Sequence, residues 1–368
     1  MSELLGHYEH QLSATAFPDP VGCYLSLTQT PAIAASGEAR MRVLRLLLSL
    51  LGAALFAGLL VEIGPSQIMA EFRELSWRLG ILLVFPFCLV TAADTLGWRY
   101  AFRRDVVPYT ALLRVRMAGE AFNATTPTAS VGGEAVKAWL LRRWVPMSES
   151  LPSVIVAKTT ITIAQALFLL LGLAVAGLVL PEGSILLYGM RWLLVVEVLA
   201  VGGFVLVQVM GAIGGGGRIL QRLGVMGEGA GAEIVGRIDR SLVEFYRQAP
   251  GRLALSTAAH FLGWAFSAVE AYVILHAMGL PVSFTTAVVI EAFGTGVRFI
   301  SFMIPAHLGA LEGGYVATFA ALGLGGPAGL TFSLVRRLRE AAWTGMGFVL
   351  LSALREPGRA VPALESEA

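Results

Sequence analysis

Two apolar stretches of the chain repeat one arrangement of a proline, a glutamate and a basic residue. The first set is Pro127, Glu134 and Lys158, and the second, with the same intervals of seven and twenty-four residues, is Pro305, Glu312 and Arg336. Glycines surround both sets. Because charged side chains are costly inside a membrane, a repeated set at equal spacing indicates a duplicated functional unit. It predicts a transport site between two half-molecules.

These residue types can bind an anionic lipid headgroup. Gly132 and Gly133 precede Glu134 at the expected start of a short helix, where unpaired amides and a partial positive charge favour phosphate or carboxylate. Arginine suits bidentate phosphate contact and lysine acts as a point charge, so Lys158 and the arginines of the last apolar segment are candidate ligands. The glutamates, Glu340 included, can neutralise these bases in the empty site or carry a coupled proton.

The same charged residues can instead be structural ion pairs between helices. Arg298 follows Glu291 by seven residues on one helical face, and forms either an internal pair with it or part of a second gate. Three single acids in apolar segments are expected to be helix-packing partners: Asp94, Glu197 and Glu270. His307 is expected to line the site and His260 to pack between helices.

Composition places the chain in a membrane. It is 56% hydrophobic and 14% charged, with a mean hydropathy of +0.72, whereas a soluble domain is about 25% charged. A net charge of +2 without a basic, aromatic-interleaved patch argues against nucleic acid as a partner. The two cysteines form no metal or disulfide framework, and no known catalytic motif is present, so no cofactor or metal is expected.

Six apolar segments approach the roughly 20 residues that a helix needs to cross a bilayer: 46–61, 80–98, 153–180, 192–213, 253–280 and 330–354. Arginines and lysines cluster before the first, after the second and after the fourth segment, so the positive-inside rule places the N-terminus in the cytoplasm. The polar connection after the fourth segment has an apolar stripe at helical spacing. It predicts an amphipathic helix on the cytoplasmic face, which is either a hinge between two halves or a lipid-sensing element.

Two further segments, 110–145 and 284–324, are predicted to be helices broken at the proline and glycines. Such backbone is tolerated at membrane depth where protein or water surrounds it, so both segments are predicted to be re-entrant hairpins, although 284–304 is long enough to span. Each half then has three crossings and one hairpin. Because three is an odd number, the second half has the opposite orientation in the membrane to the first. The hairpins then open from opposite sides, as in transporters with inverted repeats. The tripeptide EAF, at 120–122 and again at 291–293, is a weak further sign of duplication.

The predicted fold is therefore an all-α polytopic membrane protein of about six full spans plus two re-entrant helical hairpins, arranged as an inverted-topology repeat. Its predicted parts are a disordered leader at 1–39, a first membrane half at 40–213, a cytoplasmic connector at 214–252, a second membrane half at 253–356 and a tail at 357–368. Both termini are expected in the cytoplasm.

Four sequence blocks carry a resemblance to a known family: GEAFNATTPTASVGGEAVKAWLLRRW at 119–144, SVIVAKT at 153–159, IPAHLGALEGG at 304–314 and SLVRRLRE at 333–340. They resemble the flippase-like membrane domain of the lysylphosphatidylglycerol synthase family, and look most like its hopanoid-locus subgroup. The resemblance extends from about residue 43 to 354. It implies a lipid translocase or lipid-handling protein of the bacterial inner membrane. The soluble aminoacyl-transfer domain of the bifunctional relatives has no counterpart here, so this chain is not expected to synthesise lysylphosphatidylglycerol.

The matched motifs, together with the spacing of Arg298, define the candidate substrate-binding residues. They are Asn123, Pro127, Gly132, Gly133, Glu134, Lys158, Arg298, Pro305, Gly309, Glu312, Gly313, Arg336, Arg337, Arg339 and Glu340. The favoured function is a lipid flippase or transporter that moves an anionic phospholipid, a hopanoid or a polyprenyl-linked lipid between leaflets. The alternatives are a membrane-embedded transferase that uses a lipid-linked donor and a non-catalytic scaffold for lipid-biosynthesis enzymes.

Overall fold

The described part of the chain is a bundle of helices. A computed structural model describes residues 32–64, 66, 77–126, 132–210 and 230–355, and the regular elements within these ranges are α-helices and short 3-10 turns. The helices of the first half are α3 (Ala32–Ile63), α5 (Arg78–Leu82), α6 (Phe87–Tyr100), α7 (Tyr109–Thr125), α8 (Gly132–Leu140), α9 (Met147–Val179) and α10 (Ile185–Val209). Those that follow are α12 (Ala230–Gln248), α13 (Pro250–Ala277), α14 (Phe284–Ile300), α15 (Ala310–Ala321) and α16 (Gly326–Arg355), with 3-10 turns η1 (Leu141–Arg143) and η2 (Pro305–His307).

The apolar helices confirm a polytopic membrane protein. Among the described residues, four helical stretches are long and apolar enough to cross a bilayer: Arg78–Tyr100, Met147–Val179, Ile185–Val209 and Pro250–Ala277. They correspond to four of the six predicted spans. The other two predicted spans lie in α3, which has a shorter apolar stretch at Leu50–Ile63, and in α16, where four charged residues at 336–340 interrupt the apolar sequence.

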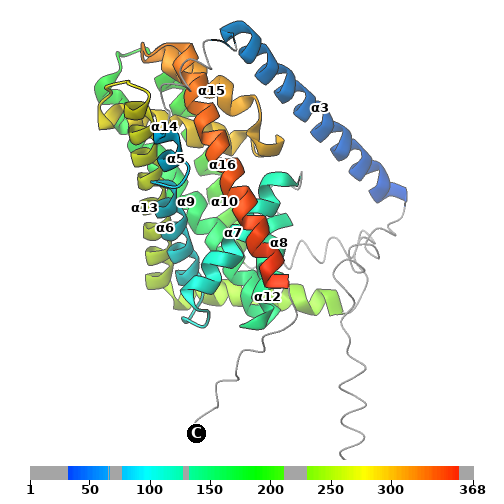
Figure 1. Cartoon of the computed structure of the whole chain (residues 1–368). Coiled ribbons are helices and arrows are strands. Elements are labelled where there is room, and N and C mark those ends of the chain that lie inside the picture. Colours follow the sequence, from blue (N-terminus) through cyan, green and yellow to red (C-terminus); the bar gives the residue numbers. More distant parts are fainter. Residues whose placement is uncertain (1–31, 65, 67–76, 127–131, 211–229, 356–368) are drawn as a thin grey trace, which may run out of the picture.

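Two hydrophobic cores lie at opposite ends of the bundle (Figure 1). The lower core joins the ends of α6, α8 and α16 to the starts of α7 and α9, and its buried residues include Trp98, Leu112 and Leu141. The upper core joins α14 and α15 to the end of α9 and the start of α10, around Phe168, Phe319 and Phe332. Each core therefore encloses one of the two segments predicted to be broken.

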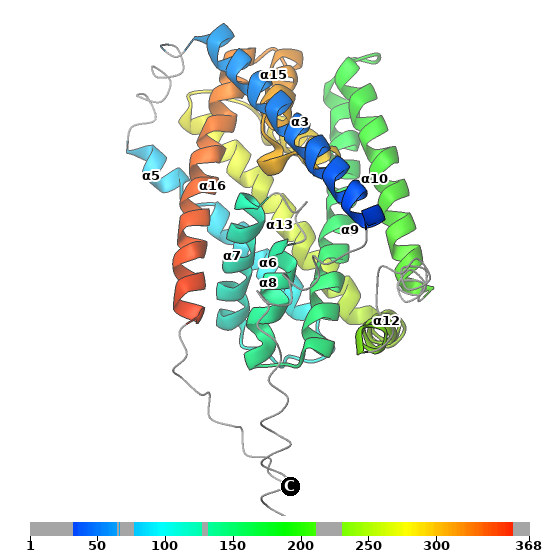
Figure 2. The ribbon, with the colours of Figure 1, turned by 90° about the vertical axis from the view of Figure 1, so that its right-hand side faces the viewer.

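Both predicted breaks are present as interrupted helices. Residues 127–131, including Pro127, lie outside the described residues, and α7 and α8 flank them. In the second segment the backbone turns at η2, where Ala306 and His307 have positive φ angles of 51° and 55°, followed by Gly309 at 78°. Figure 2 shows α7 and α8 in the lower half of the bundle and α15 in the upper half. The two interrupted segments therefore enter the bundle from opposite ends.

Helix α12 lies across the lower end of the bundle (Figure 1). The apolar stripe predicted for it is buried in the lower core through Ile238, Leu242 and Phe245. The described part of this stripe therefore faces protein and connects α12 to the helices of the lower core. The salt bridge from Arg103 to Glu244, 2.9 Å long, further attaches α12 to the loop after α6.

Helix α3 crosses the bundle diagonally and stands apart from most of it (Figures 1 and 2). It begins at Ala32, eight residues before the predicted boundary at 40, and residues 1–31 lie outside the described part. Its close contact is with the second break, where a Cβ on Gly52 would lie 2.3 Å from the Leu308 carbonyl oxygen. The absence of a side chain at Gly52 lets α3 meet this backbone directly.

Candidate functional site

The first break holds a cluster of paired charges between α7 and α8. Lys137 Nζ lies 2.6 Å from Glu120 Oε1 and 3.0 Å from Glu134 Oε2, and its side chain is only 5% exposed. Lys158 Nζ, on α9, lies 3.7 Å from the other Glu134 oxygen, and its side chain is half exposed. Asn123 donates to Glu134 Oε1 at 3.2 Å and accepts from the Gly133 amide at 2.7 Å.

Glycines make this cluster possible because they let α7 and α8 approach closely. A Cβ on Gly133 would lie 2.1 Å from the Gly119 carbonyl oxygen, and a Cβ on Gly119 would lie 2.3 Å from the Lys137 side chain. The pair of glycines thus leaves room for the lysine stem to run between the two helices. Its ammonium group then emerges between the two glutamates.

The second break holds a comparable cluster around Glu312. One carboxylate oxygen accepts from the Gly309 amide at 2.7 Å, and the other accepts from Arg337 Nε at 2.7 Å. Arg337 also lies 3.1 Å from Glu340, whose other oxygen is 3.4 Å from Arg298. The second motif is therefore a chain of alternating charges that links the start of α15 to α16 and α14.

A third network lies deeper, where Arg336 is almost completely buried. Its guanidinium pairs with both oxygens of Glu291, donates to the Tyr315 hydroxyl at 2.9 Å and lies 3.4 Å from Glu270. Arg339 Nε lies 3.0 Å from the second oxygen of Glu270. Since each buried ion has an opposite charge beside it, this network can persist in an apolar interior.

Asp94 forms a further ionic group that joins α6, α7 and α13. Its two oxygens lie 2.7 Å from Arg116 and 3.0 Å from His260 Nδ1. A Cβ on Gly97 would lie 2.6 Å from the His260 ring, and a Cβ on Gly263 would lie 2.6 Å from Asp94 Oδ1. Helices α6 and α13 therefore each supply one polar side chain and one glycine that makes room for the other helix's side chain.

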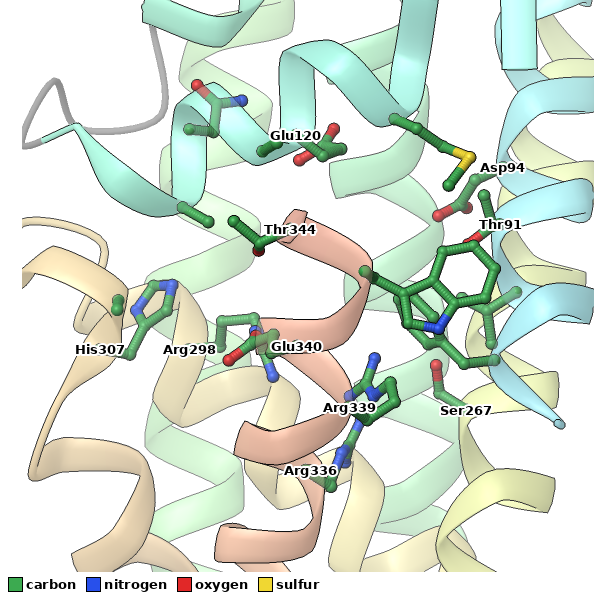
Figure 3. Close-up of a pocket in the computed structure, with 18 of the residues that line it drawn as sticks. Thr91, Asp94, Glu120, Ser267, Arg298, His307, Arg336, Arg339, Glu340 and Thr344 are labelled. Carbon is green, nitrogen blue, oxygen red and sulfur yellow. The ribbon is translucent and has the colours of Figure 1, made fainter. Parts of the chain in front are cut away.

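These groups surround one cavity of about 320 Å³ near the middle of the bundle. Figure 3 shows Asp94 and Glu120 on one side of it and the group of Arg298, Glu340 and Arg339 on the other. The walls also carry Trp264, Trp343, Phe302 and other apolar side chains, so the cavity is amphipathic. Its charged lining residues, with histidine taken as neutral, comprise four cations and three anions. The cations are Arg116, Arg298, Arg336 and Arg339, and the anions are Asp94, Glu120 and Glu340.

Five of the candidate residues named from the sequence line this cavity. They are Asn123 from the first motif, Arg336, Arg339 and Glu340 from the second, and Arg298 of α14. The others that the structure places, Gly132, Gly133, Glu134, Lys158, Pro305, Gly309, Glu312, Gly313 and Arg337, belong to the helices and turns around it. His307 also lines the cavity, as expected, and His260 is buried in packing, as expected.

The contacts in the structure add three details to the sequence interpretation. Glu312 meets Arg337 and not Arg336, the base at the repeated spacing, because neighbouring residues on a helix point in different directions. Arg298 pairs with Glu340, so the internal pair with Glu291, one of its two alternatives, is not formed. The Gly133 amide at the start of α8 is hydrogen-bonded to the Asn123 side chain, so it is not free to bind an anion in this conformation.

Sequence reasoning also missed Glu120, Lys137 and Arg116, which form much of the first cluster. Lys137 entered the prediction only as a positive charge that orients the chain, yet it is buried. The repeated EAF tripeptide was the available signal. Glu120 pairs with Lys137, and its counterpart Glu291 pairs with Arg336, so the glutamate of each copy binds a base of its own half.

Two of the three single acids are helix-packing partners, as predicted. Asp94 pairs with Arg116 and His260, and Glu270 pairs with Arg336 and Arg339. Glu197 differs, because neither carboxylate oxygen has a hydrogen-bond partner among the described residues. Within the residues that the structure describes, no group of three or more His, Cys, Asp or Glu side chains is suited to hold a metal ion.

Comparison with known proteins agrees with this architecture. The family model described as the lysylphosphatidylglycerol synthase TM region matches residues 42–345. The chain belongs to this family. The matched region contains both breaks, all four ionic groups described above and the cavity.

A relative from Methanothermobacter thermautotrophicus, described as a UPF0104 membrane protein, is 23% identical over an alignment of 325 residues. The alignment covers 79% of this chain and 90% of the relative. No solved structure matches the chain. The comparisons therefore establish the family and the membrane class.

Proposed function

We propose that this protein moves a lipid with a phosphate-bearing, anionic headgroup from one leaflet of the membrane to the other. The observation that carries the proposal is that side chains from both interrupted segments line one amphipathic cavity. Asn123 comes from the first interrupted segment, and Arg298 and His307 come from the second. Such a site, placed between two halves that open to opposite sides, is the arrangement of transporters with discontinuous helices.

Arg298 is the cavity cation best placed to bind a phosphate. Its side chain is 28% exposed, and its pair with Glu340 is long, at 3.4 Å. Glu340 keeps a second partner in Arg337 at 3.1 Å. An incoming phosphate can therefore replace Glu340 at Arg298 without leaving that carboxylate unpaired, and arginine offers the forked donors that suit phosphate.

An inverted repeat is part of the proposal, and the crossing points of the helices support it. A Cβ on Gly347 of α16 would lie 2.6 Å from the Ala121 Cβ of α7. A Cβ on Gly172 of α9 would lie 2.1 Å from the Ala292 Cβ of α14. Ala121 and Ala292 are the central residues of the two EAF tripeptides. Each interrupted segment thus packs on a glycine in the long helix of the opposite half.

In this proposal six spans cross the membrane: α3, α5 with α6, α9, α10, α13 and α16. The α7–α8 and α14–α15 segments are re-entrant hairpins. Arginines at 99, 103, 104, 142, 143 and 252 flank the helices of the lower end, which the positive-inside rule assigns to the cytoplasm. Both termini then lie in the cytoplasm, and the membrane is the inner membrane. Rocking of one half against the other would open the cavity to each side in turn.

The proposal is tested with purified protein in liposomes that contain traces of fluorescent phosphatidylglycerol or fluorescent phosphatidylcholine. Loss of fluorescence to an impermeant reductant measures how fast the inner-leaflet lipid reaches the outer leaflet. We expect the protein to accelerate movement of the anionic lipid, and Arg298→Gln to reduce that acceleration at least about tenfold, the equivalent of losing one charge-assisted contact.

Arg191→Gln is the matched control, because Arg191 is exposed near the start of α10 and does not line the cavity. It should leave the rate unchanged. Movement no faster than in protein-free liposomes, for either of these lipids and for a polyprenyl phosphate added as a third probe, would remove the support for lipid transport.

A further inference from the structure

Glu197 is a completely buried carboxyl group that the proposed lipid pathway does not use. It lies halfway along α10, its residue is 0% exposed, and neither side-chain oxygen has a hydrogen-bond partner among the described residues. It does not line the cavity. This sets it apart from Asp94 and Glu270, whose carboxylates are paired with bases.

The surroundings of Glu197 follow from the contacts of α10 with α9 and α14. Met190 lies against Gly172 of α9, and Gln208 donates to Thr159 Oγ1 of α9 at 3.0 Å, so Glu197 lies between these two contacts. One turn before it, Leu193 packs against Gly296 of α14. Glu197 therefore occupies the layer where α9, α10 and α14 meet.

The ionisable groups of the elements packed on α10 are few in this layer. From 159 to 179, α9 has no ionisable side chain. The charged groups of α14, Glu291 and Arg298, are paired with Arg336 and Glu340. The remaining ionisable groups on packed elements are Glu149 and Lys158 near the start of α9, Glu312 and Tyr315 of α15, those of α12 near the end of α10, and Tyr188 and Arg191 of α10 itself. Lys158 lies beside Glu134. No described residue neutralises a charge on Glu197.

These surroundings decide the protonation state. An ionised carboxylate without a partner is strongly disfavoured in an apolar interior, whereas a neutral carboxyl group is tolerated at a smaller cost. Glu197 therefore holds a proton in this conformation. Its hydroxyl still has no acceptor among the described residues, and an unsatisfied buried polar group in a membrane span points to function.

A polar connection between α9 and α14 lies in the same layer. Gln165 Nε2 donates to the Thr295 carbonyl oxygen at 2.8 Å. Ile161, four residues before Gln165 on α9, lines the cavity, and so does Arg298, three residues after Thr295 on α14. Movement of either helix at the cavity would therefore alter the layer that contains Glu197.

We propose that Glu197 is a proton-binding site that couples this layer to the transport cycle. In the present conformation its O–H bond is intact. When α9, α10 and α14 rearrange and admit water, the O–H bond breaks, the proton passes to water and the carboxylate remains with one negative charge. Return to this conformation requires a proton to be taken up again. The coupling rests on the proposed lipid transport, but binding and exchange of the proton are independent of it.

Infrared spectroscopy of the full protein in lipid nanodiscs tests proton binding directly. We expect the wild type at neutral pH to show the carbonyl band of a protonated carboxyl group, which Glu197→Gln lacks and Glu182→Gln retains. Glu182 is the matched control because it is exposed in the loop after α9. The band should shift on transfer to D₂O and lose intensity as the pH is raised. Absence of the band, or a band that responds to neither treatment, would overturn the proposal.

Coupling is tested in liposomes with and without a pH gradient. We expect the gradient to accelerate lipid movement by the wild type and by Glu182→Gln, and to leave Glu197→Gln at its rate without a gradient. Glu197→Leu controls for folding, because removal of an unsatisfied carboxyl group should raise its melting temperature. A Leu variant that is stabilised and still responds fully to the gradient would overturn the proposal. If the wild type moves no lipid, the proposed function fails, and the infrared result alone decides proton binding.

Discussion

Single residues show how this protein keeps charged groups inside an apolar bundle. Lys137, Arg336 and Arg339 are all buried, and each lies against at least one carboxylate. Breaking such a pair by removing one partner leaves an uncompensated buried charge, which typically costs about 3–5 kcal/mol. These paired bases therefore connect helices, and Arg336 and Arg339 also line the cavity together with Arg298 and Glu340.

The glycines beside Asp94 and His260 let α6 and α13 pack closely, because a single added Cβ atom would clash with the facing side chain. Gly97→Ala places a methyl group 2.6 Å from the His260 ring, which is itself buried and hydrogen-bonded to Asp94. Because overpacking of a well-packed site costs about 1–3 kcal/mol, we expect a clear drop in the melting temperature of the purified protein. Calorimetry or a fluorescence melt measures it.

Gly177→Ala is the control for this prediction. Gly177 is also a helical glycine, but a Cβ there meets no atom within 4 Å, so the gain in helix propensity should make the variant at least as stable as the wild type. Equal melting temperatures for the wild type and Gly97→Ala would show that α6 and α13 do not approach as closely as described.

At the scale of elements, the turn between α14 and α15 depends on Gly309. Its φ of 78° is unfavourable for other residues, and a Cβ would lie 2.3 Å from the Gly52 carbonyl oxygen of α3. We expect Gly309→Ala to loosen both the turn and the attachment of α3, with a stability loss of about 2 kcal/mol or more. Hydrogen exchange should become faster in residues 304–312 and in α3.

Gly313→Ala tests whether this effect is specific to the turn. Gly313 belongs to the same motif, but it lies within α15 and its nearest side-chain neighbour, Leu55, would be at an ordinary 3.6 Å from the new methyl group. Exchange rates in this variant should match the wild type. Equal acceleration in both variants would mean that the contact with α3 does not depend on the Gly309 backbone.

The loop after α6 is attached to α13 through Asp105. Its oxygens accept from Arg252 at 2.7 Å and Arg99 at 2.8 Å, and the hydrogen bond from Arg252, aided by Arg99, holds the pKa of the Asp105 carboxyl below its ordinary value. A carboxyl group whose pKa is lower in the folded state stabilises the fold above the unfolded-state pKa of about 4 and loses this contribution as the pH falls through the folded-state value.

We therefore expect Asp105→Asn to be less stable than the wild type at neutral pH, by less than about 1 kcal/mol because the pair is partly exposed. The difference should shrink as the pH falls below about 4. Thermal melts at several pH values measure it, and Glu182→Gln, an exposed acid, should show no such difference. A difference that is constant at all pH values would exclude the ionic contribution.

At the scale of the whole molecule, much of the plan could be predicted from the sequence. The apolar segments predicted a membrane protein, and the prolines and glycines within two of the segments predicted the interrupted helices. The partners of the charged residues could not be predicted, because they depend on helix rotation and on contacts between distant segments. Arg298, for example, meets Glu340, forty-two residues away in the chain, instead of Glu291 on its own helix.

The cavity also could not be predicted from either motif alone. Much of its wall comes from residues outside both motifs, such as Thr91, Trp264 and Ser267 on α6 and α13. The cavity forms where these helices meet the two interrupted segments. The alanines of the two EAF tripeptides, Ala121 and Ala292, each lie against a glycine of a long helix, a contact that the tripeptides alone did not predict.

The proposed topology makes a prediction for the two ends of the bundle. Single cysteines at Arg104 and Arg247 should react with an impermeant maleimide from the same side of the membrane, and a cysteine at Glu182 from the other side. The three positions are exposed, and Cys23 and Cys88 are replaced first. Labelling of Arg104→Cys and Glu182→Cys from one side would contradict the six-span arrangement.

The central claim is that lipid headgroups pass through the cavity between the two interrupted segments, and filling the cavity tests it most directly. Thr344 lines the cavity, whereas its neighbour Gly345 is exposed on the outside of α16 with no atom within 4 Å of a Cβ. In the liposome assay we predict that Thr344→Trp reduces anionic lipid movement to the protein-free rate and that Gly345→Trp stays near the wild-type rate. Wild-type movement by a folded Thr344→Trp protein would contradict the claim.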